Sequence, residues 1–329
     1  MGLLVTTPML KLFSSTDLHI EVSSKCTLKC PRCPRTELDP DGLNREFSIA
    51  EFKAAFPIDQ LKDVRKIVFC GDIGDPIYAT DFLEIVEYLK TFSTADLSIV
   101  TNGSYKKTEW WQELGKWLSN YDTVTFSVDG WDHDSNNLYR INSNWDSIIN
   151  GIQSLRAASN CRIAWSAIYF KFNEDRMTHI RSIATSLGCD EFQSVLSSKF
   201  DGRYSVDGFD PLKPVNPTNL STGQYIKETL TIGRVRRVHP IKYQNRHEWA
   251  RCLNWQKELF INVDGLVFPC PWFNSGYQEN DFVQKYRDRL SVKTRSLNEV
   301  LEDPMWEEFI TRIETMPLEV CRIKCRDCR

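Results

Sequence analysis

The sequence lacks the marks of membrane-spanning and secreted proteins. No apolar run approaches the roughly 20 residues that a membrane span needs. The short apolar stretch at residues 1–13 has neither a basic region before it nor a small-residue cleavage site after it. An excess of charge of one sign is also missing, since 41 basic residues face 44 acidic ones and the formal net charge is -3. No global field therefore draws the chain to nucleic acid or to an anionic membrane, and we predict a cytoplasmic protein.

Cysteine, by contrast, is abundant, and disulfides do not account for it. The chain has 11 cysteines, an odd number, and without a secretory signal disulfides are not the default. Eight of them fall into three groups, at positions 26/30/33, 252/270 and 321/325/328. Clustered thiols of this kind predict metal or redox chemistry.

The first two hundred residues alternate between buried strands and amphipathic helices, which predicts an α/β fold. Six strand–helix units in a row imply a parallel sheet with right-handed crossovers. Six units suit either a doubly wound sheet or an open, partial barrel, but not a closed eight-stranded one. The predicted strands are 18–23, 66–70, 97–101, 123–128, 161–170 and 191–195, and the predicted helices lie at about 48–56, 79–92, 108–118, 145–155 and 173–187.

Polar or glycine-rich stretches follow each of the first four predicted strands. The first strand leads to three cysteines, and the others lead to GDIGDP (71–76), TNG (101–103) and SVDG (127–130). Each stretch alone is typical of an ordinary turn. In a parallel fold, however, all four lie at the carboxyl ends of the strands, where such folds place their sites. Together they predict one functional site.

The pattern changes after residue 200. Gly, Pro, Asp and Ser are frequent in the segment that follows, which indicates a linker or insertion over 201–245, after a barrel domain over 15–200. A small α+β domain is predicted over 246–329. Within it, Asp264-Gly265 indicates a two-residue hairpin turn. Ser296 and Glu299 match a capping box that begins a helix.

The three cysteines Cys26, Cys30 and Cys33 can all bind one iron–sulfur cluster, because thiolate is the usual cluster ligand. Three ligands on a four-iron cluster leave one iron open, and an open position on a metal is where a substrate can bind. The CxxxCxxC pattern resembles the signature of the radical S-adenosylmethionine (SAM) superfamily. The resemblance implies a [4Fe–4S] cluster whose open iron is chelated by SAM, and a partial (β/α)6 barrel.

The resemblance extends to the other strand ends, where it implies SAM-binding residues. GDIGDP resembles the glycine-rich stretch that meets the SAM amine, with Asp75 where Glu is more common. Arg140 lies eleven residues after Asp129 and suits a carboxylate, because its planar fork matches that anion. Arg32 departs from the family, since an aromatic residue often precedes the third cysteine. The implied SAM-binding residues are Gly71, Asp72, Gly74, Asp75, Thr101, Asn102, Ser127, Asp129 and Arg140.

The later cysteines resemble the twitch or SPASM extensions of radical SAM enzymes, which hold auxiliary [4Fe–4S] clusters. Five cysteines imply one auxiliary cluster with four ligands, and a zinc site is the alternative. The five candidates are Cys252, Cys270, Cys321, Cys325 and Cys328. Cys70 lies beside GDIGDP, where core packing competes with a role as hydrogen donor to a substrate radical.

We therefore expect a radical SAM oxidoreductase or modifying enzyme. The resemblance implies reductive cleavage of SAM to a 5′-deoxyadenosyl radical that abstracts a substrate hydrogen, with flavodoxin or ferredoxin as electron donor. The substrate, a small molecule or a peptide, and the outcome, dehydrogenation, cross-linking or epimerisation, stay open. The alternative is a non-catalytic zinc or iron–sulfur module that contacts nucleic acid through the basic run at 234–242.

Overall fold

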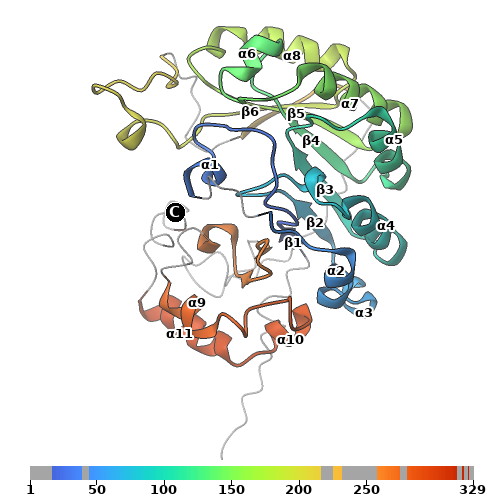
Figure 1. Cartoon of the computed structure of the whole chain (residues 1–329), viewed down its shortest axis with the longest axis vertical. Coiled ribbons are helices and arrows are strands. Elements are labelled where there is room, and N and C mark those ends of the chain that lie inside the picture. The colour runs from blue at the N-terminus through green and yellow to red at the C-terminus, as the bar shows by residue number, and fades with distance from the viewer. Residues whose placement is uncertain are drawn as a thin grey trace, which may run out of the picture.

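The computed structural model describes residues 17–38, 44–215, 225–231, 258–274, 280–316, 321 and 325. In this part of the chain a single sheet has the strand order β7-β6-β5-β4-β3-β2-β1-β8-β9 (Figure 1). Its strands are β1 Asp17–Ile20, β2 Lys66–Phe69, β3 Asp96–Thr101, β4 Thr123–Ser127, β5 Arg162–Ile168, β6 Glu191–Val195, β7 Tyr225–Thr229, β8 Leu259–Ile261 and β9 Val267–Phe268.

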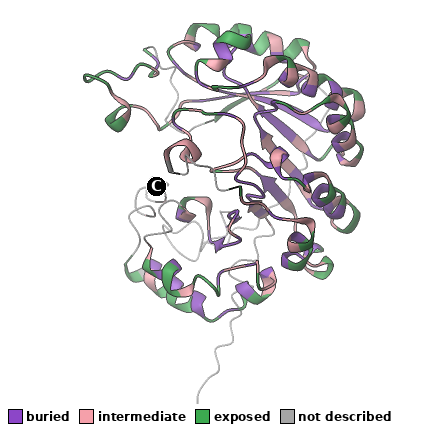
Figure 2. Ribbon diagram, viewed as in Figure 1, coloured by how far each residue is buried: buried purple, intermediate pink, exposed green. Residues whose placement is uncertain are grey.

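The six predicted strands form the centre of this sheet, each parallel to the next in sequence order. An α/β fold with a partial-barrel core is thereby confirmed. The strands carry fully buried side chains of the core, and the helices that cover the sheet expose their outer faces to solvent (Figure 2). This pattern is typical of a parallel sheet. The helices are α1 Pro34–Leu38, α2 Ile49–Ala55, α3 Ile58–Leu61, α4 Phe82–Phe92, α5 Thr108–Trp117, α6 His133–Asn137, α7 Trp145–Ala158, α8 Met177–Ser186, α9 Asp281–Tyr286, α10 Leu297–Leu301 and α11 Met305–Thr315.

Two glycines let the outer helices α5 and α7 approach each other closely. A Cβ added to Gly151 would lie 2.7 Å from Nε1 of Trp111, and one added to Gly115 would lie 2.7 Å from the Cβ of Ala158. The indole of Trp111 is fully buried in this contact and tilts against Phe126 of β4. The helix layer is thus fixed against the strands whose ends carry the predicted site.

The sheet continues beyond the six predicted strands on both sides. β8 pairs in parallel with β1, matching Leu18 with Leu259, and β9 pairs antiparallel with β8. The predicted hairpin is present, but its connection spans five residues, 262–266, between the last paired residues Ile261 and Val267. Gly265 takes a positive φ of 79° there, which glycine adopts at little cost.

The segment predicted as a linker contributes a strand. β7 lies within 201–245 and pairs antiparallel with β6, so this stretch is not solely a linker. The basic run at 234–242 lies outside the described residues. Among the described helices, each is too short or too polar to cross a membrane.

The polar residues at the starts of two predicted helices, Thr108 and Asn173, invite interpretation as N-caps, but neither side chain caps its helix. Lys107 holds the N-cap position of α5, while the Thr108 hydroxyl donates a hydrogen bond to Asn150 of α7 at 3.1 Å. Asn173 caps no helix through its side chain. Instead its amide group joins the ends of β4 and β5, because Nδ2 donates to the backbone oxygens of Asp129 and Ile168. The predicted capping box of Ser296 and Glu299 is confirmed at α10.

Candidate active site and cluster-binding loop

The three cysteines of the signature lie on the loop that leads from β1 to α1. The loop closes on itself, since the backbone N–H of Cys33 donates to the oxygen of Cys30 at 3.1 Å. All three side chains are half-buried. Burial raises the pKa of the Cys26 thiol to about 12 and that of Cys30 to about 11, and the neighbouring thiols add to both shifts. The Cys26 and Cys30 thiols are therefore neutral without a metal, and a bound metal would hold them as thiolates.

The three thiols are a donor set of the kind that holds an iron–sulfur cluster. Within the part of the chain that the structure describes, no three Cys, His, Asp or Glu side chains converge on one metal ion. Three thiolates on one short loop are nevertheless a donor set that iron–sulfur clusters use. The residues present therefore fit a cluster with three protein ligands.

The glycine-rich loop after β2 packs directly against the start of the cysteine loop. A Cβ at Gly74 would lie 1.8 Å from the backbone oxygen of Ser23, and one at Gly71 would lie 2.4 Å from the oxygen of Gly74. The backbone N–H of Asp75 also donates to the oxygen of Lys25 at 3.0 Å. No side chain fits at either glycine, because the backbone of Ser23 and of Gly74 occupies the space that a Cβ would need. The two glycines therefore let the loop pack tightly against the cysteine loop.

Asp75 joins the glycine-rich loop to the end of β3. Its Oδ2 accepts hydrogen bonds from the Thr101 hydroxyl at 3.1 Å, from the Asn102 backbone N–H at 2.7 Å and from Asn102 Nδ2 at 2.6 Å. Oδ1 accepts from the backbone N–H of Ile77. Burial raises the pKa of this carboxyl to about 6. The structure thus gives Asp75 an internal positioning role that the sequence did not predict.

Asn102 reaches the cluster-binding loop itself. Its Nδ2 lies 3.6 Å from Sγ of Cys26, within the range of an N–H···S hydrogen bond. Nearby, the Tyr78 hydroxyl donates to the backbone oxygen of Ser104 at 2.7 Å and lies 2.8 Å from Thr27 Oγ1. The ends of β2 and β3 are therefore both tied to the cysteine loop.

A buried ion pair follows β4. Nε of Arg140 lies 2.8 Å from Oδ2 of Asp129, and the Asp129 side chain is fully buried. Burial disfavours the charge on the guanidinium, but Asp129 outweighs it and holds the pKa of Arg140 above its usual value. Both charges also act on the pKa of the Cys30 thiol, which places the pair beside the cysteine loop.

Asp129 is fixed from several sides. Its Oδ1 accepts from the backbone N–H of Ile168 at 2.7 Å, and its own N–H donates to Asn136 Oδ1 at 3.0 Å. Ser127 is half-buried at the end of β4, opposite Ser166 of β5. The four predicted strand-end stretches thus meet around one loop of three thiols.

Cys70 directly follows β2 and is half-buried. Burial raises the pKa of its thiol to about 12, with further contributions from Asp72, Asp75 and Glu21. It is therefore an uncharged S–H group at ordinary pH. Its backbone oxygen lies 2.8 Å from Nε2 of His19 in β1. Cys161 and Cys189 are fully buried, as expected of packing residues.

Glu21 is a buried residue of the site that sequence reasoning missed. Its carboxylate accepts from the backbone N–H of Ile73 at 2.8 Å and of Val263 at 3.2 Å. One side chain at the end of β1 therefore joins the glycine-rich loop to the hairpin that follows β8. Burial raises the pKa of this carboxyl to about 7. A lone Glu beside the CxxxCxxC motif was the available signal, but its partners are distant in sequence.

The later cysteines are described in part. Cys270 follows β9, and both Cys270 and Cys321 are half-buried against the hydrophobic core. Cys325 is also half-buried. Cys252 and Cys328 lie outside the described residues. Which four of the five would hold an auxiliary cluster stays a prediction.

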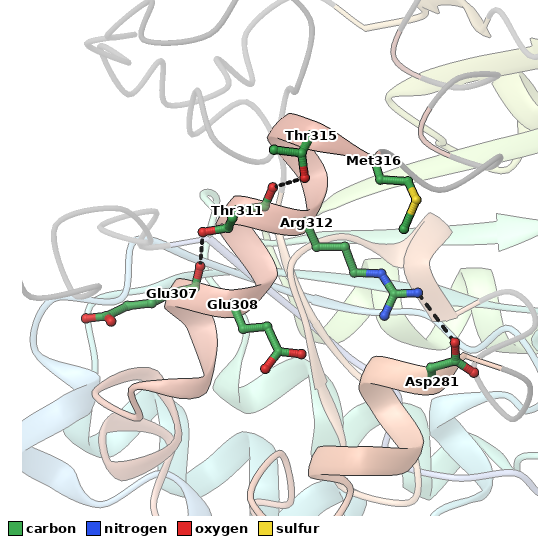
Figure 3. Close-up of a pocket in the computed structure, with 7 residues that line it drawn as sticks. All are labelled: Asp281, Glu307, Glu308, Thr311, Arg312, Thr315 and Met316. Atoms are coloured by element: carbon green, nitrogen blue, oxygen red, sulfur yellow. Dashed lines mark hydrogen bonds and ion pairs between the residues drawn. The ribbon is translucent and has the colours of Figure 1, made fainter.

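A surface hollow of about 590 Å³ lies elsewhere, beside α9 and α11 (Figure 3). Its lining includes an Arg312–Asp281 ion pair of 3.7 Å and the exposed side chain of Met316. None of its lining residues is a cysteine or a predicted SAM contact. The hollow is wide open to solvent, whereas a cofactor site encloses most of its ligand.

Comparisons with known proteins agree with the site. Residues 20–180 match the model of the radical SAM superfamily, and residues 252–329 match that of an iron–sulfur cluster-binding domain, SPASM. These matches imply a SAM-binding [4Fe–4S] cluster and auxiliary iron–sulfur clusters, in accord with the cysteine groups.

Solved structures share the fold. SuiB of Streptococcus suis bound to S-adenosylmethionine is 16% identical, with a TM-score of 0.56 over 89% of this chain and 67% of that one. The protein anSMEcpe with bound AdoMet and the Cp18Cys peptide is 15% identical, with a TM-score of 0.55 over 95% of this chain and 89% of that one. At these identities the likeness concerns the fold.

Curated relatives match over shorter stretches. A probable GTP 3′,8-cyclase of Methanococcus maripaludis is 29% identical over 139 residues, which is 41% of this chain and 43% of that protein. The same enzyme from another strain is 32% identical over 91 residues, 26% of this chain and 28% of that protein. The chain therefore spans less than half the length of these relatives. On the family matches and the fold together, residues 20–180 of this chain form a radical SAM domain, and residues 252–329 match an iron–sulfur cluster-binding domain.

Proposed function

We propose that this protein cleaves SAM reductively and uses the resulting 5′-deoxyadenosyl radical to abstract hydrogen from a substrate, as an oxidoreductase or modifying enzyme. The supporting observation is the meeting of four strand ends around Cys26, Cys30 and Cys33. A [4Fe–4S] cluster at these thiols, with SAM on its open iron, would supply the radical chemistry.

The residues of the chain would bind and orient the cosubstrate. Asp129 pairs with Nε of Arg140, which leaves the outer nitrogens of the guanidinium fork facing an anion such as the SAM carboxylate. Gly71 and Gly74 hold the glycine-rich loop close to the cysteine loop, where its backbone would meet the methionine part. The remaining proposed SAM contacts are Asp72, Asp75, Thr101, Asn102, Ser127 and Asp129.

We further propose that the substrate is a peptide or a small molecule. SuiB has been solved with its precursor peptide SuiA and anSMEcpe with peptides, which supports a peptide for this fold. The auxiliary cluster would be held by four of the five later cysteines and would serve substrate binding or electron transfer. Flavodoxin or ferredoxin, in the cytoplasm, would donate the electron. Cys70 would return a hydrogen atom if the reaction is an epimerisation, because its thiol stays protonated.

The test is anaerobic reconstitution with iron and sulfide, followed by SAM and a reductant. About eight irons per chain, the content of two four-iron clusters, and release of 5′-deoxyadenosine support the proposal. Cys30→Ala should abolish deoxyadenosine and keep about four irons, those of one cluster. Cys189→Ala is the control, because this cysteine is fully buried near the opposite ends of the strands. Zinc in place of iron, or iron without deoxyadenosine, would contradict the proposal.

A further inference from the structure

Arg32 lies between two cluster cysteines, yet its guanidinium is buried. The side chain is 5% exposed and forms an ion pair with Asp210, whose side chain is 0% exposed. The same guanidinium lies 5.2 Å from the ring centroid of Phe200 and 4.6 Å from that of Tyr204. A planar guanidinium suits such a position, since it can stack on rings and pair with a carboxylate at once.

The four partners of Arg32 belong to one segment, residues 199–213, which we call the strap. It follows β6 and lies beside α1 (Figure 1). Lys199 Nζ donates to the backbone oxygen of Arg32 at 2.8 Å, and Arg32 donates to the backbone oxygen of Lys199. Glu37 of α1 accepts from the Tyr204 hydroxyl at 2.6 Å and from Arg203 at 2.8 Å. The strap thus contacts the cysteine loop and the helix directly after it.

Asp210 connects the strap internally. Its Oδ2 accepts from the backbone N–H of Asp201 at 2.9 Å, and its Oδ1 accepts from that of Leu212 at 3.0 Å. The strap has little core of its own, because Val206 and Phe209 are 66% and 54% exposed and Leu212 is half-buried. Lys171 also contacts the strap, since its backbone N–H donates to the oxygen of Leu212 at 3.0 Å and its Nζ lies over the ring of Phe209. Among these contacts Arg32 supplies the buried ion pair.

We propose that Arg32 is a positioning residue that holds the strap closed against the cluster-binding loop, and that the closed strap limits access of water and oxygen to the cluster. Removing one partner of a buried ion pair leaves the other charged and desolvated, which favours opening of the strap. Water near an iron–sulfur cluster raises its reduction potential, because it stabilises the added negative charge.

The test uses Arg32→Met and Asp210→Asn in the anaerobically loaded protein. Lys213→Met is the matched control, because Lys213 pairs with Asp201 in the same strap but on its exposed surface. Amide hydrogen exchange over 199–213 should become roughly 100-fold faster in both variants, the change expected when a buried pair is broken. In the same two variants, the first cluster should lose iron to a chelator faster than in the parent. Lys213→Met should show the parent's exchange rate and iron loss, and the auxiliary cluster should lose iron at the parent's rate in every variant.

A redox titration separates positioning from a general loss of stability. The potential of the cluster whose spectrum responds to SAM should move to more positive values in Arg32→Met and Asp210→Asn, while that of the auxiliary cluster stays fixed. Asp210 is 178 residues from Arg32 along the chain, so Asp210→Asn tests the proposal even where Arg32→Met does not load iron. Unchanged exchange in the strap would overturn the proposal, as would a faster exchange without faster iron loss or a shift in potential.

Discussion

Replacing Glu21 with glutamine should destabilise the folded protein at acidic pH and stabilise it at alkaline pH. The Glu21 carboxyl is 2% exposed and accepts two backbone hydrogen bonds, from Ile73 and Val263. Burial raises its pKa from 4.5 to about 7 in the folded protein. Between these values the folded state holds a proton that the unfolded state has lost. The free energy of unfolding therefore falls as pH rises through this window, and the contribution of the proton is fully present only below pH 4.5.

The magnitude follows from the shift. A change of 2.5 pKa units corresponds to about 3 kcal/mol at most, at about 1.4 kcal/mol per unit. Glu21→Gln removes this pH dependence and loses one of the two hydrogen bonds, at a cost of about 1 kcal/mol. The variant should therefore be less stable than the parent by about 1 kcal/mol at pH 4, about equally stable at pH 5 and more stable by about 2 kcal/mol at pH 8.

Thermal unfolding under argon at pH 4, 5, 6 and 8 measures this reversal. About 2–4 °C per kcal/mol is expected, and the difference in Tm between variant and parent should change sign near pH 5. Asp75, whose pKa is also raised, is present in both proteins and cancels in the difference. Glu113→Gln, on the exposed face of α5, is the control and should give a difference that does not vary with pH. The same Tm difference for Glu21→Gln at pH 5 and pH 8 would refute the reasoning.

Two further substitutions test the loops around the cysteines. Gly74→Ala should weaken SAM binding by roughly 5-fold to 150-fold, because its Cβ would lie 1.8 Å from the Ser23 oxygen and relief of such a clash costs about 1–3 kcal/mol. Equilibrium dialysis with labelled SAM measures this, and normal affinity would show that the loop moves freely. Asn102→Ala removes the donor 3.6 Å from Cys26 Sγ, so the potential of the first cluster should become more negative. A redox titration followed by electron paramagnetic resonance checks it, with the auxiliary cluster as reference, and an unchanged potential would exclude the hydrogen bond.

The six central strands could be predicted because each is a buried run bounded by polar residues. β6 begins and ends at its predicted residues, and β5 is shorter than predicted by one residue at its start and two at its end. β8 could not be predicted as part of this sheet, because its partner β1 lies some 240 residues earlier in the chain. A run of three apolar residues also does not indicate which strand it pairs with or in which register. β7 was missed because its side chains are mostly exposed, so YIKET shows no buried face.

The candidate site was predictable where its chemistry is local in sequence. The cysteine spacing and the glycine-rich loop are short motifs, and both lie where the sequence placed them. The roles of Glu21 and Arg32 were not predictable, because each depends on a partner far along the chain, Val263 and Asp210. A charged residue beside a motif has the same appearance in sequence whether it faces a ligand or a distant backbone.

These buried charges share one physical task. Loops at the carboxyl ends of strands lie beyond the sheet ladder, so other groups must satisfy their backbone and fix their positions. Glu21 does this for the glycine-rich loop, Asp75 for the end of β3 and Asp129 for the end of β5. It follows that loss of activity in Asp75→Ala or Asp129→Ala does not by itself identify a SAM contact. Such a variant also releases a strand end, so its SAM affinity has to be compared with hydrogen exchange at Asn102 or Ile168, and only a loss of affinity without faster exchange marks a ligand contact.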